Sequence, residues 1–290
     1  MSENINSEQE HRERVQKYYT VAQPFYEYLW HGKALGLHYG FWTDNVSNRT
    51  GAIVKENEIL ADLAGIKQND LVLDAGCGVG GSGIWLAKER GAKVVGLNIV
   101  DKQLIRGKDL VKKKDLAQKA DFVKGDYQRL PFRNGVFDIF WSLESIEHAT
   151  NLKDFMKDAF RVLKPGGKII VAGTFLGNKK DISPEEKRQM EIGQSVAGCF
   201  NDFRTAQANI EIMKEAGFVD LQNLDKTTWV MKSAEQMTKM CRLGVPVAKL
   251  LSSLRIVSSI LVLNNQWGTY QEGLFRSGVT SYNVLLANKP

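Results

Sequence analysis

The chain has 290 residues, of which 43% are hydrophobic and 25% charged, and these ordinary globular values exclude a disordered or fibrous protein. Its net charge of +6 lies in residues 226–290, where five Lys and three Arg stand against two Glu. No uncharged run reaches the roughly 20 residues of a membrane-spanning helix, and the polar N-terminus resembles neither a secretory signal nor a transit peptide. Three cysteines without a C-x-x-C pair argue for a reducing compartment, so we expect a cytoplasmic protein.

In chain order, residues 1–60 are expected to form a helical cap whose helices are joined by an aromatic-rich loop. Five apolar, β-rich runs follow within residues 61–175 and alternate with helix-like segments. These runs cover residues 71–76, 93–99, 120–126, 136–143 and 168–174. Strands that are separated by helices indicate βαβ units. The pattern therefore predicts an α/β fold with a mostly parallel, Rossmann-like sheet.

Residues 176–290 are expected to add helices and strands to the same domain. The predicted elements are a helix from Ser183, a helix over 205–216, a basic amphipathic region over 233–263 that breaks at 244–246, and a last strand over 279–287. Helices that enter after the fifth strand lie over the carboxyl ends of the strands, where open α/β sheets bind ligands. We expect them to form a lid. Their basic surface is either a solvated helix face or a contact for anionic lipid headgroups or an acidic partner.

A glycine-rich loop, Asp74-Ala75-Gly76-Cys77-Gly78-Val79-Gly80-Gly81, follows the first predicted strand and opens a helix. It also fits G-x-G-x-x-G, a weak indicator of nicotinamide or flavin binding. Three features argue against that cofactor. Asp74 would repel a pyrophosphate but attract an ammonium or sulfonium group, Asn98 replaces the acidic ribose ligand of NAD sites, and Asp126-Tyr127 offers an acceptor and a ring for adenine. Together they favour S-adenosylmethionine.

Four motifs carry a resemblance to a known family: D-A-G-C-G-V-G-G (74–81), G-D-Y-Q-R-L-P-F (125–132), F-D-I-F-W-S-L-E-S-I-E-H (137–148) and R-V-L-K-P-G-G-K (161–168). They resemble class I S-adenosylmethionine-dependent methyltransferases. More narrowly, residues 18–42 and the closing T-S-Y-N-V-L-L-A-N-K-P are similar to the group of tocopherol C-methyltransferases, sterol C-24 methyltransferases and cyclopropane fatty acid synthases. The resemblance implies a class I methyltransferase sheet whose last strand is antiparallel, with an N-terminal helical cap and a C-terminal helical lid.

The resemblance also implies a set of residues that bind S-adenosylmethionine. Gly76, Cys77 and Gly78 would hold the methionine part, Asn98 and Gln103 the ribose, and Asp126 and Tyr127 the adenine. Ser142 would line the site after the fourth strand. Tyr19 and His38 would close over the cofactor from the N-terminal segment.

The motif S-L-E-S-I-E-H brings Glu144, Glu147 and His148 to the carboxyl end of the fourth predicted strand. Glu144 and His148 are four residues apart, so a helical start would put them on one face. Because imidazole ordinarily titrates near neutral pH, His148 is the preferred candidate for a general base or a contact with a substrate hydroxyl, with Glu144 beside it. The alternatives are a His that caps the following helix and a Glu in a structural ion pair. Tyr19 is the candidate for a ring beside the sulfonium.

These observations predict a methyltransferase that acts on a small lipophilic acceptor, either an isoprenoid, a sterol-like molecule or a prenylated or phenolic ring, with C- and O-methylation both open. The alternatives are N-methylation of a small polar amine, cyclopropanation of acyl chains, and a protein that binds S-adenosylmethionine without catalysis. No nucleic-acid module accompanies the charge, and the four histidines show no metal-ligand spacing. We therefore expect neither a metal nor a nucleic-acid partner, and the basic C-terminal region is the candidate for peripheral membrane contact.

Overall fold

A computed structural model describes residues 2–30, 32–197 and 203–290, so His31 and Cys199 lie outside the described residues, whereas Cys77 and Cys241 are free, buried thiols. The helices are α1 (Ser2–Phe25), η1 (Tyr26–Trp30), η2 (Gly32–Ala34), α2 (Arg49–Ala64), α3 (Gly81–Trp85), η3 (Leu86–Arg90), α4 (Asp101–Lys113), η4 (Ile146–His148), α5 (Leu152–Val162), α6 (Pro184–Ala197), α7 (Ala206–Glu215), α8 (Thr227–Ser253), α9 (Ser259–Gly268) and α10 (Gln271–Arg276). The strands are β1 (Leu71–Ala75), β2 (Lys93–Asn98), β3 (Ala120–Lys124), β4 (Phe137–Leu143), β5 (Leu163–Leu176), β6 (Val219–Asp225) and β7 (Thr280–Asn288).

The described strands form one seven-stranded sheet in the order β3-β2-β1-β4-β5-β7-β6. The first five strands pair in parallel, whereas β7 is antiparallel to both of its neighbours, β5 and β6. The central strands are apolar because helices cover both faces of the sheet there. This arrangement confirms the predicted α/β class, the mostly parallel sheet and the antiparallel last strand.

Two hydrophobic clusters hold the sheet between its helix layers. One packs α2, α3, η3 and α4 against one face, with Trp141 and Tyr282 among its fully buried side chains. The other packs α5 and α7 against the opposite face around Phe140 and Phe155. Because both faces are buried, the ligand-accessible part of the sheet is the edge at which its parallel strands end.

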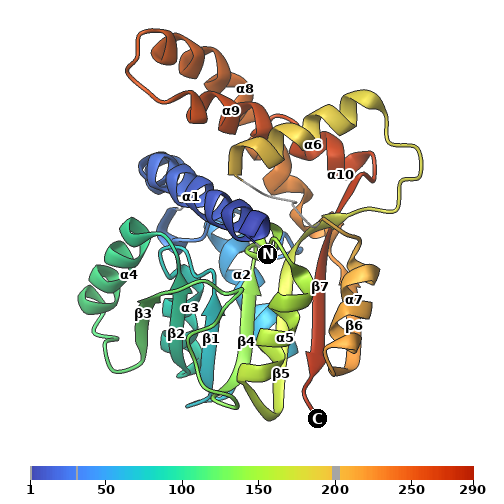
Figure 1. The fold of residues 1–290 in the computed structure, drawn as a ribbon. Helices are drawn as coiled ribbons and strands as arrows, with labels where there is room; N and C mark the ends of the chain where they lie inside the picture. Colours follow the sequence, from blue (N-terminus) through green and yellow to red (C-terminus); the bar gives the residue numbers. More distant parts are fainter. Residues whose placement is uncertain (1, 31, 198–202) are drawn as a thin grey trace.

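Helices from both ends of the chain cover that edge. Figure 1 shows α1 crossing above the ends of the central strands, with α6, α8 and α9 beyond it. A third hydrophobic cluster joins Tyr18 and Ala22 of α1 to Val196 of α6 and Leu261 of α9. No helix among the described residues is long and apolar enough to cross a membrane. The N-terminal cap and the C-terminal helices thus form one roof over the sheet.

The structure differs from the sequence expectation at three elements. The predicted break at residues 244–246 is wrong, because α8 continues through Pro246 to Ser253. Packing against α9 maintains the helix: a β-carbon on Gly244 would lie 2.3 Å from an oxygen of Asn265, so this glycine allows close contact. Strand β5 starts at Leu163, earlier than expected. Strand β6 was not predicted, because its side chains are largely exposed at the sheet edge and show no apolar run.

Candidate active site

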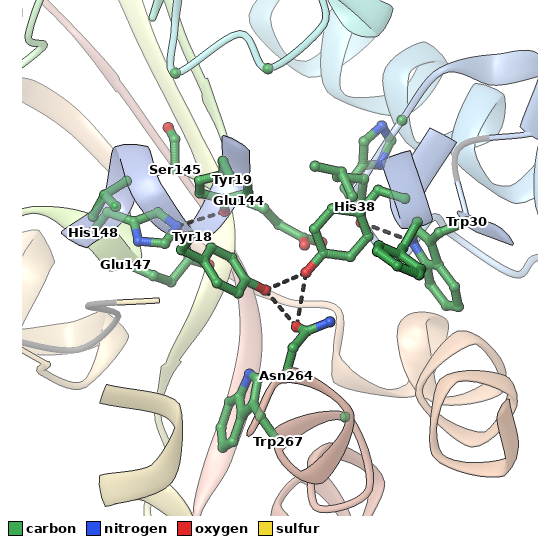
Figure 2. A pocket seen from close by; sticks show the side chains of 18 of the residues that line it. Tyr18, Tyr19, Trp30, His38, Glu144, Ser145, Glu147, His148, Asn264 and Trp267 are labelled. Carbon is green, nitrogen blue, oxygen red and sulfur yellow. Dashed lines mark hydrogen bonds between the residues drawn. The ribbon is translucent and has the colours of Figure 1, made fainter. Parts of the chain in front are cut away.

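A cavity of about 580 Å³ lies between the sheet edge and the helical roof. Its floor is built from residues that follow β1, β2, β3 and β4, and its roof from α1, α8 and α9. Figure 2 shows Glu144 between His148 on one side and His38 on the other, with Asn264 and Trp267 of α9 across the cavity. The cavity brings together every residue that the sequence predicted for cofactor binding or catalysis except Ser142.

The glycine loop that follows β1 needs conformations that side chains disfavour. Gly76 and Gly78 have positive φ values of 86° and 55°. A β-carbon on Gly76 would lie 2.4 Å from the β-carbon of Ser145, whereas the side of Gly78 faces open space. The loop therefore leaves a shallow cradle beside Gly78, into which a ligand can approach the backbone. Cys77 also lines the cavity as a buried thiol.

Asp74 carries a buried carboxyl group at the floor of the cavity. Its Oδ2 has no hydrogen-bond partner among the described residues. Burial raises the pKa of Asp74 to about 7, an effect that a hydrogen bond with the Gly83 backbone partly opposes. A cationic group in the adjoining cavity would stabilise the ionised carboxylate. This orphaned oxygen suits the ammonium and sulfonium groups of S-adenosylmethionine and disfavours a pyrophosphate.

A chain of side-chain amides lies at the end of β2. Asn98 donates from Nδ2 to the backbone oxygen of Gly78 (3.1 Å) and to Oε1 of Gln103 (2.8 Å). Gln103 in turn donates to Oε1 of Gln23 on α1 (2.9 Å), whose own Nε2 is buried without a partner among the described residues. Asn98 and Gln103 thus lie where the sequence predicted a ribose contact. Gln23 was not predicted, because only the fold brings α1 to this position.

Asp126 and Tyr127 follow β3 and line the same cavity. Asp126 accepts a hydrogen bond from the backbone N–H of Gln128 (2.9 Å) and pairs with Arg12 of α1 at 3.4 Å. The Tyr127 hydroxyl donates to the backbone oxygen of Ser145 (2.9 Å), which fixes the ring at the wall of the cavity. The pair offers the carboxylate and the aromatic surface that an adenine contact requires.

Helix α1 covers the cavity and contacts His148 through Tyr19 and His11. The Tyr19 hydroxyl lies 2.9 Å from Nε2 of His148, and the two rings meet edge to face at 5.5 Å. His11 donates from Nε2 to the backbone oxygen of His148 (2.9 Å). The imidazole of His148 is thereby oriented by the cap, and Nε2 must exchange its tyrosine partner for a substrate before it can act as a base.

His38 is held from the other side by a carboxylate that the sequence analysis missed. Glu56 of α2 is fully buried, and its Oε2 lies 2.5 Å from Nδ1 of His38. The same carboxylate accepts from the Gly40 backbone N–H (3.0 Å) and the Tyr282 hydroxyl (2.6 Å). Nε2 of His38 is buried without a partner among the described residues. With Nδ1 fixed by Glu56, Nε2 is free to contact a ligand.

Glu144 lies at a strained position after β4, with a positive φ of 46°. Its Oε1 accepts from the Tyr39 backbone N–H (2.8 Å) and lies 3.1 Å from the Tyr282 hydroxyl, which is closer to Glu56. Burial, followed by the nearby charges of Glu56 and Glu147, raises the pKa of Glu144 well above its usual value. The expected shared helix face with His148 is wrong, because only the short η4 forms and Glu144 precedes it. The left-handed backbone turns Glu144 toward the cap instead.

Glu147 is the third acidic group at this end of the cavity. Its Oε1 accepts from the Thr174 backbone N–H (2.7 Å), while its Oε2 is buried without a partner among the described residues. Burial raises the pKa of Glu147 to about 7. The motif E-S-I-E-H contains both Glu144 and Glu147, and nothing in the motif favours Glu147 as the residue that accepts a proton. The unpaired Oε2 of Glu147 is the feature that favours it.

Ser142 does not line the cavity. Its hydroxyl lies 2.8 Å from the Ser145 hydroxyl, which donates to the backbone oxygen of Ala75 (2.6 Å). Ser145 takes the lining position instead. The reason is the alternation of side chains along a strand, which turns Ser142 into the sheet interior. Among the described residues, no group of three His, Cys, Asp or Glu is arranged to hold a metal ion.

Comparison with known proteins agrees with this geometry. Residues 73–171 match the family described as "Methyltransferase domain". The sterol 24-C-methyltransferase of Saccharomyces cerevisiae is 34% identical over 197 residues, which cover 67% of this chain and 50% of the yeast protein. Cycloartenol-C-24-methyltransferase 1 of rice is 32% identical over 204 residues, or 70% of this chain and 58% of that protein. The chain thus spans about half the length of the curated relatives that it matches.

Solved structures share the fold at low sequence identity. The cyclopropane synthase MmaA2 from Mycobacterium tuberculosis has a TM-score of 0.83 at 15% identity and covers 96% of this chain and 98% of its own. A geranyl diphosphate C-methyltransferase from Streptomyces coelicolor has a TM-score of 0.74 at 18% identity, with 97% and 98% covered. These findings confirm the resemblance predicted from the sequence: residues 73–171 carry a methyltransferase domain, and the fold is that of the class I S-adenosylmethionine-dependent methyltransferases.

Proposed function

We propose that this protein transfers a methyl group from S-adenosylmethionine to carbon in a neutral lipophilic acceptor with an alkene, of the sterol or isoprenoid class. The observation that carries the proposal is one continuous cavity, which joins a polar floor suited to S-adenosylmethionine to a roof that α8 lines with apolar side chains. The matched segments of sterol 24-C-methyltransferases support carbon as the methylated atom. Bound S-adenosylmethionine would supply an electrophilic methyl carbon, and the protein would supply the rest.

The residues at the floor would hold the cofactor. The Gly78 cradle and Asp74 would bind its methionine part, Asn98 and Gln103 its ribose, and Asp126 with Tyr127 its adenine. Two buried carboxyls that line the cavity, at Asp74 and Glu147, have a pKa of about 7 and can ionise when a cation is close. A site of this kind stabilises positive charge in a space from which water is excluded.

The roof would bind the acceptor. Its lining includes Met237, Met240, Leu251, Val257 and Trp267. Burial of an apolar acceptor against such a surface is favourable by about 25 cal/mol per Å². A small polar amine would lose its hydration against these side chains without gaining a charged partner from them.

The small number of cationic side chains around the cavity limits the chemical class of the acceptor further. Arg12 is the one Lys or Arg among the described residues that line it, and Arg12 already pairs with Asp126. A diphosphate group carries several negative charges and needs more than one such partner. We therefore infer an acceptor without a diphosphate, such as a sterol-like alcohol or a hydrocarbon chain.

Glu147 is our candidate for the base that accepts the proton lost from the acceptor after carbon is methylated. Its Oε2 is unpaired among the described residues, and its pKa of about 7 matches the operating pH of a general base. His148 and Glu144, the catalytic candidates from the sequence, line the same end of the cavity, and their catalytic roles remain predictions.

A direct test incubates the protein with radiolabelled S-adenosylmethionine and a panel of neutral sterol alkenes, isoprenoid alcohols, phenols and small amines. Label in a sterol or isoprenoid product, with a new carbon–methyl bond seen by nuclear magnetic resonance, is the expected result. Label only in phenols or amines would refute the proposed acceptor. Tight binding of S-adenosylhomocysteine without transfer to any acceptor would favour the non-catalytic alternative.

A further inference from the structure

The last turns of α8 and the turn that follows carry a row of exposed apolar side chains. Leu243, Val247, Leu250 and Leu254 are spaced by four, three and four residues, which puts them on one face of the helix. These four and Ile256 are between 56% and 77% exposed. Isolated exposed leucines are ordinary, but a continuous row of this kind indicates a binding surface. We call these five residues the hairpin row.

The hairpin row lies beside cations. Lys239, Arg242 and Lys249 occupy the side of α8 next to the row, and Arg255 lies in the turn after it. The sequence has no Asp or Glu between Glu235 and Glu272. Among the described residues, the ion pairs of this part of the chain belong to Arg276, and none involves these four cations. An apolar row flanked by unneutralised positive charge fits the surface of an anionic bilayer.

The hairpin row is continuous with the rim of the cavity. Leu243 and Val247 are exposed and at the same time line the cavity. Phe25 at the end of α1 and Leu29 of η1 also line the cavity while being 41% and 61% exposed. The mouth of the cavity is therefore bordered by apolar side chains. Figure 1 shows the free end of the α8–α9 hairpin above the far end of α1, well away from the sheet.

We propose that the hairpin row docks on an anionic lipid bilayer, with its cations at the headgroups and its apolar side chains among the upper acyl chains. In this arrangement α8 lies in the plane of the interface. Docking turns the mouth of the cavity toward the lipid, so that a lipophilic acceptor enters without crossing water. The route of the acceptor rests on the proposed function, whereas the docking itself does not.

Charge favours a bilayer over a second copy of this chain. In a two-fold symmetric pair, each copy contributes the same surface, so the cationic flank would meet or lie close to itself. Arg242, Lys249 and Arg255 of both copies would then repel each other without an acidic partner nearby. Anionic headgroups remove that repulsion and attract each cation.

Co-sedimentation with vesicles tests the docking through its charge. The full chain is mixed at low salt with phosphatidylcholine vesicles, with and without phosphatidylserine. We expect binding that needs phosphatidylserine and falls with salt. The double variant R242E/K249E should lose about tenfold or more in partitioning. The matched control K112E/K113E changes two exposed lysines on α4, remote from the hairpin, and lowers the net charge by the same amount as R242E/K249E. Its vesicle binding should fall only by what this loss of net charge causes.

The apolar contribution has its own pair of variants. L250S/L254S should weaken vesicle binding about tenfold or more, whereas I105S, an equally exposed apolar residue on α4, should leave it unchanged. Absence of wild-type binding, or equal losses in hairpin and control variants, would overturn the proposal. The proposal would also be overturned if the wild-type protein formed a dimer that L250S/L254S dissociates while vesicle binding stayed unchanged. Calorimetry with S-adenosylhomocysteine checks that each variant keeps its fold. If the protein binds vesicles but transfers no methyl group, only the proposed function is refuted and the docking proposal stands.

Discussion

The substitution Glu147→Gln separates a catalytic carboxyl from a structural one. Gln can keep the hydrogen bond from the Thr174 backbone, because its oxygen accepts where Oε1 of Glu147 does. It cannot accept a proton. If Glu147 is the base for the acceptor, kcat should fall by about 10²- to 10⁴-fold while the affinity for S-adenosylhomocysteine stays unchanged.

The same substitution should increase stability above neutral pH. Burial raises the pKa of Glu147 from 4.5 to about 7, so the folded protein retains a proton that the unfolded chain releases. Between these two pKa values the free energy of unfolding decreases as pH rises, by about 1.4 kcal/mol for each pH unit. At about pH 8 the ionised Glu147 thus costs roughly 3 kcal/mol, a cost that Gln avoids. Gln should therefore raise the thermal midpoint at that pH but have little effect at about pH 4.5.

Two assays check this reasoning together. Thermal denaturation across the pH range measures stability, and product formation from labelled S-adenosylmethionine measures kcat. Glu211→Gln, at an exposed position on α7, is the matched control and should change neither. A Glu147→Gln protein that keeps kcat within about threefold of the parent would refute the assignment of the base. A loss of stability at high pH would refute the ionisation argument.

Three further predictions concern the floor and the rim of the cavity. Asp74→Asn should weaken S-adenosylhomocysteine binding by about 10- to 100-fold in calorimetry, and wild-type affinity should rise as pH increases through about 7, because the ionised carboxylate is the binding form. Gly76→Ala should lower the free energy of unfolding by about 1–3 kcal/mol in chemical denaturation, since its φ is 86°, whereas Gly273→Ala in α10, where a β-carbon meets open space, should not. Tyr19→Phe should shift the pH dependence of kcat, because it removes the hydroxyl at Nε2 of His148, and an unchanged profile would separate the two residues functionally.

The floor of the cavity was predictable because its residues are local to strand ends. Asp74, Asn98 and Asp126 each follow a short apolar run, and the carboxyl ends of parallel strands meet at one edge of a sheet. Their positions in the sequence were therefore enough to predict that they lie close together. Ser142 shows the limit of this argument, since one step along a strand reverses the direction of a side chain.

The helical roof was predictable as helix but not in detail. Pro246 normally ends or kinks a helix, yet α8 continues through it because α9 packs closely at Gly244. That contact joins segments whose proximity no local pattern encodes. Strand β6 escaped prediction for the opposite reason, because an exposed edge strand buries too few side chains to produce an apolar run.

The acidic end of the cavity depends on contacts between remote parts of the chain. The Tyr282 hydroxyl of β7 lies within hydrogen-bond distance of both Glu56 of α2 and Glu144 after β4, while the cap supplies the Tyr39 amide and His38. Three carboxyls so close together would repel each other if all were ionised, and the raised pKa of Glu144 is the expected result. In such a cluster a proton from a reacting acceptor can go only to a carboxyl that is ionised and has an oxygen unpaired among the described residues, and a pKa of about 7 leaves Glu147 partly ionised near neutral pH. That condition singles out Glu147, and it could not be read from the motif S-L-E-S-I-E-H, because the partners that occupy Glu144 come from segments more than 100 residues away on either side.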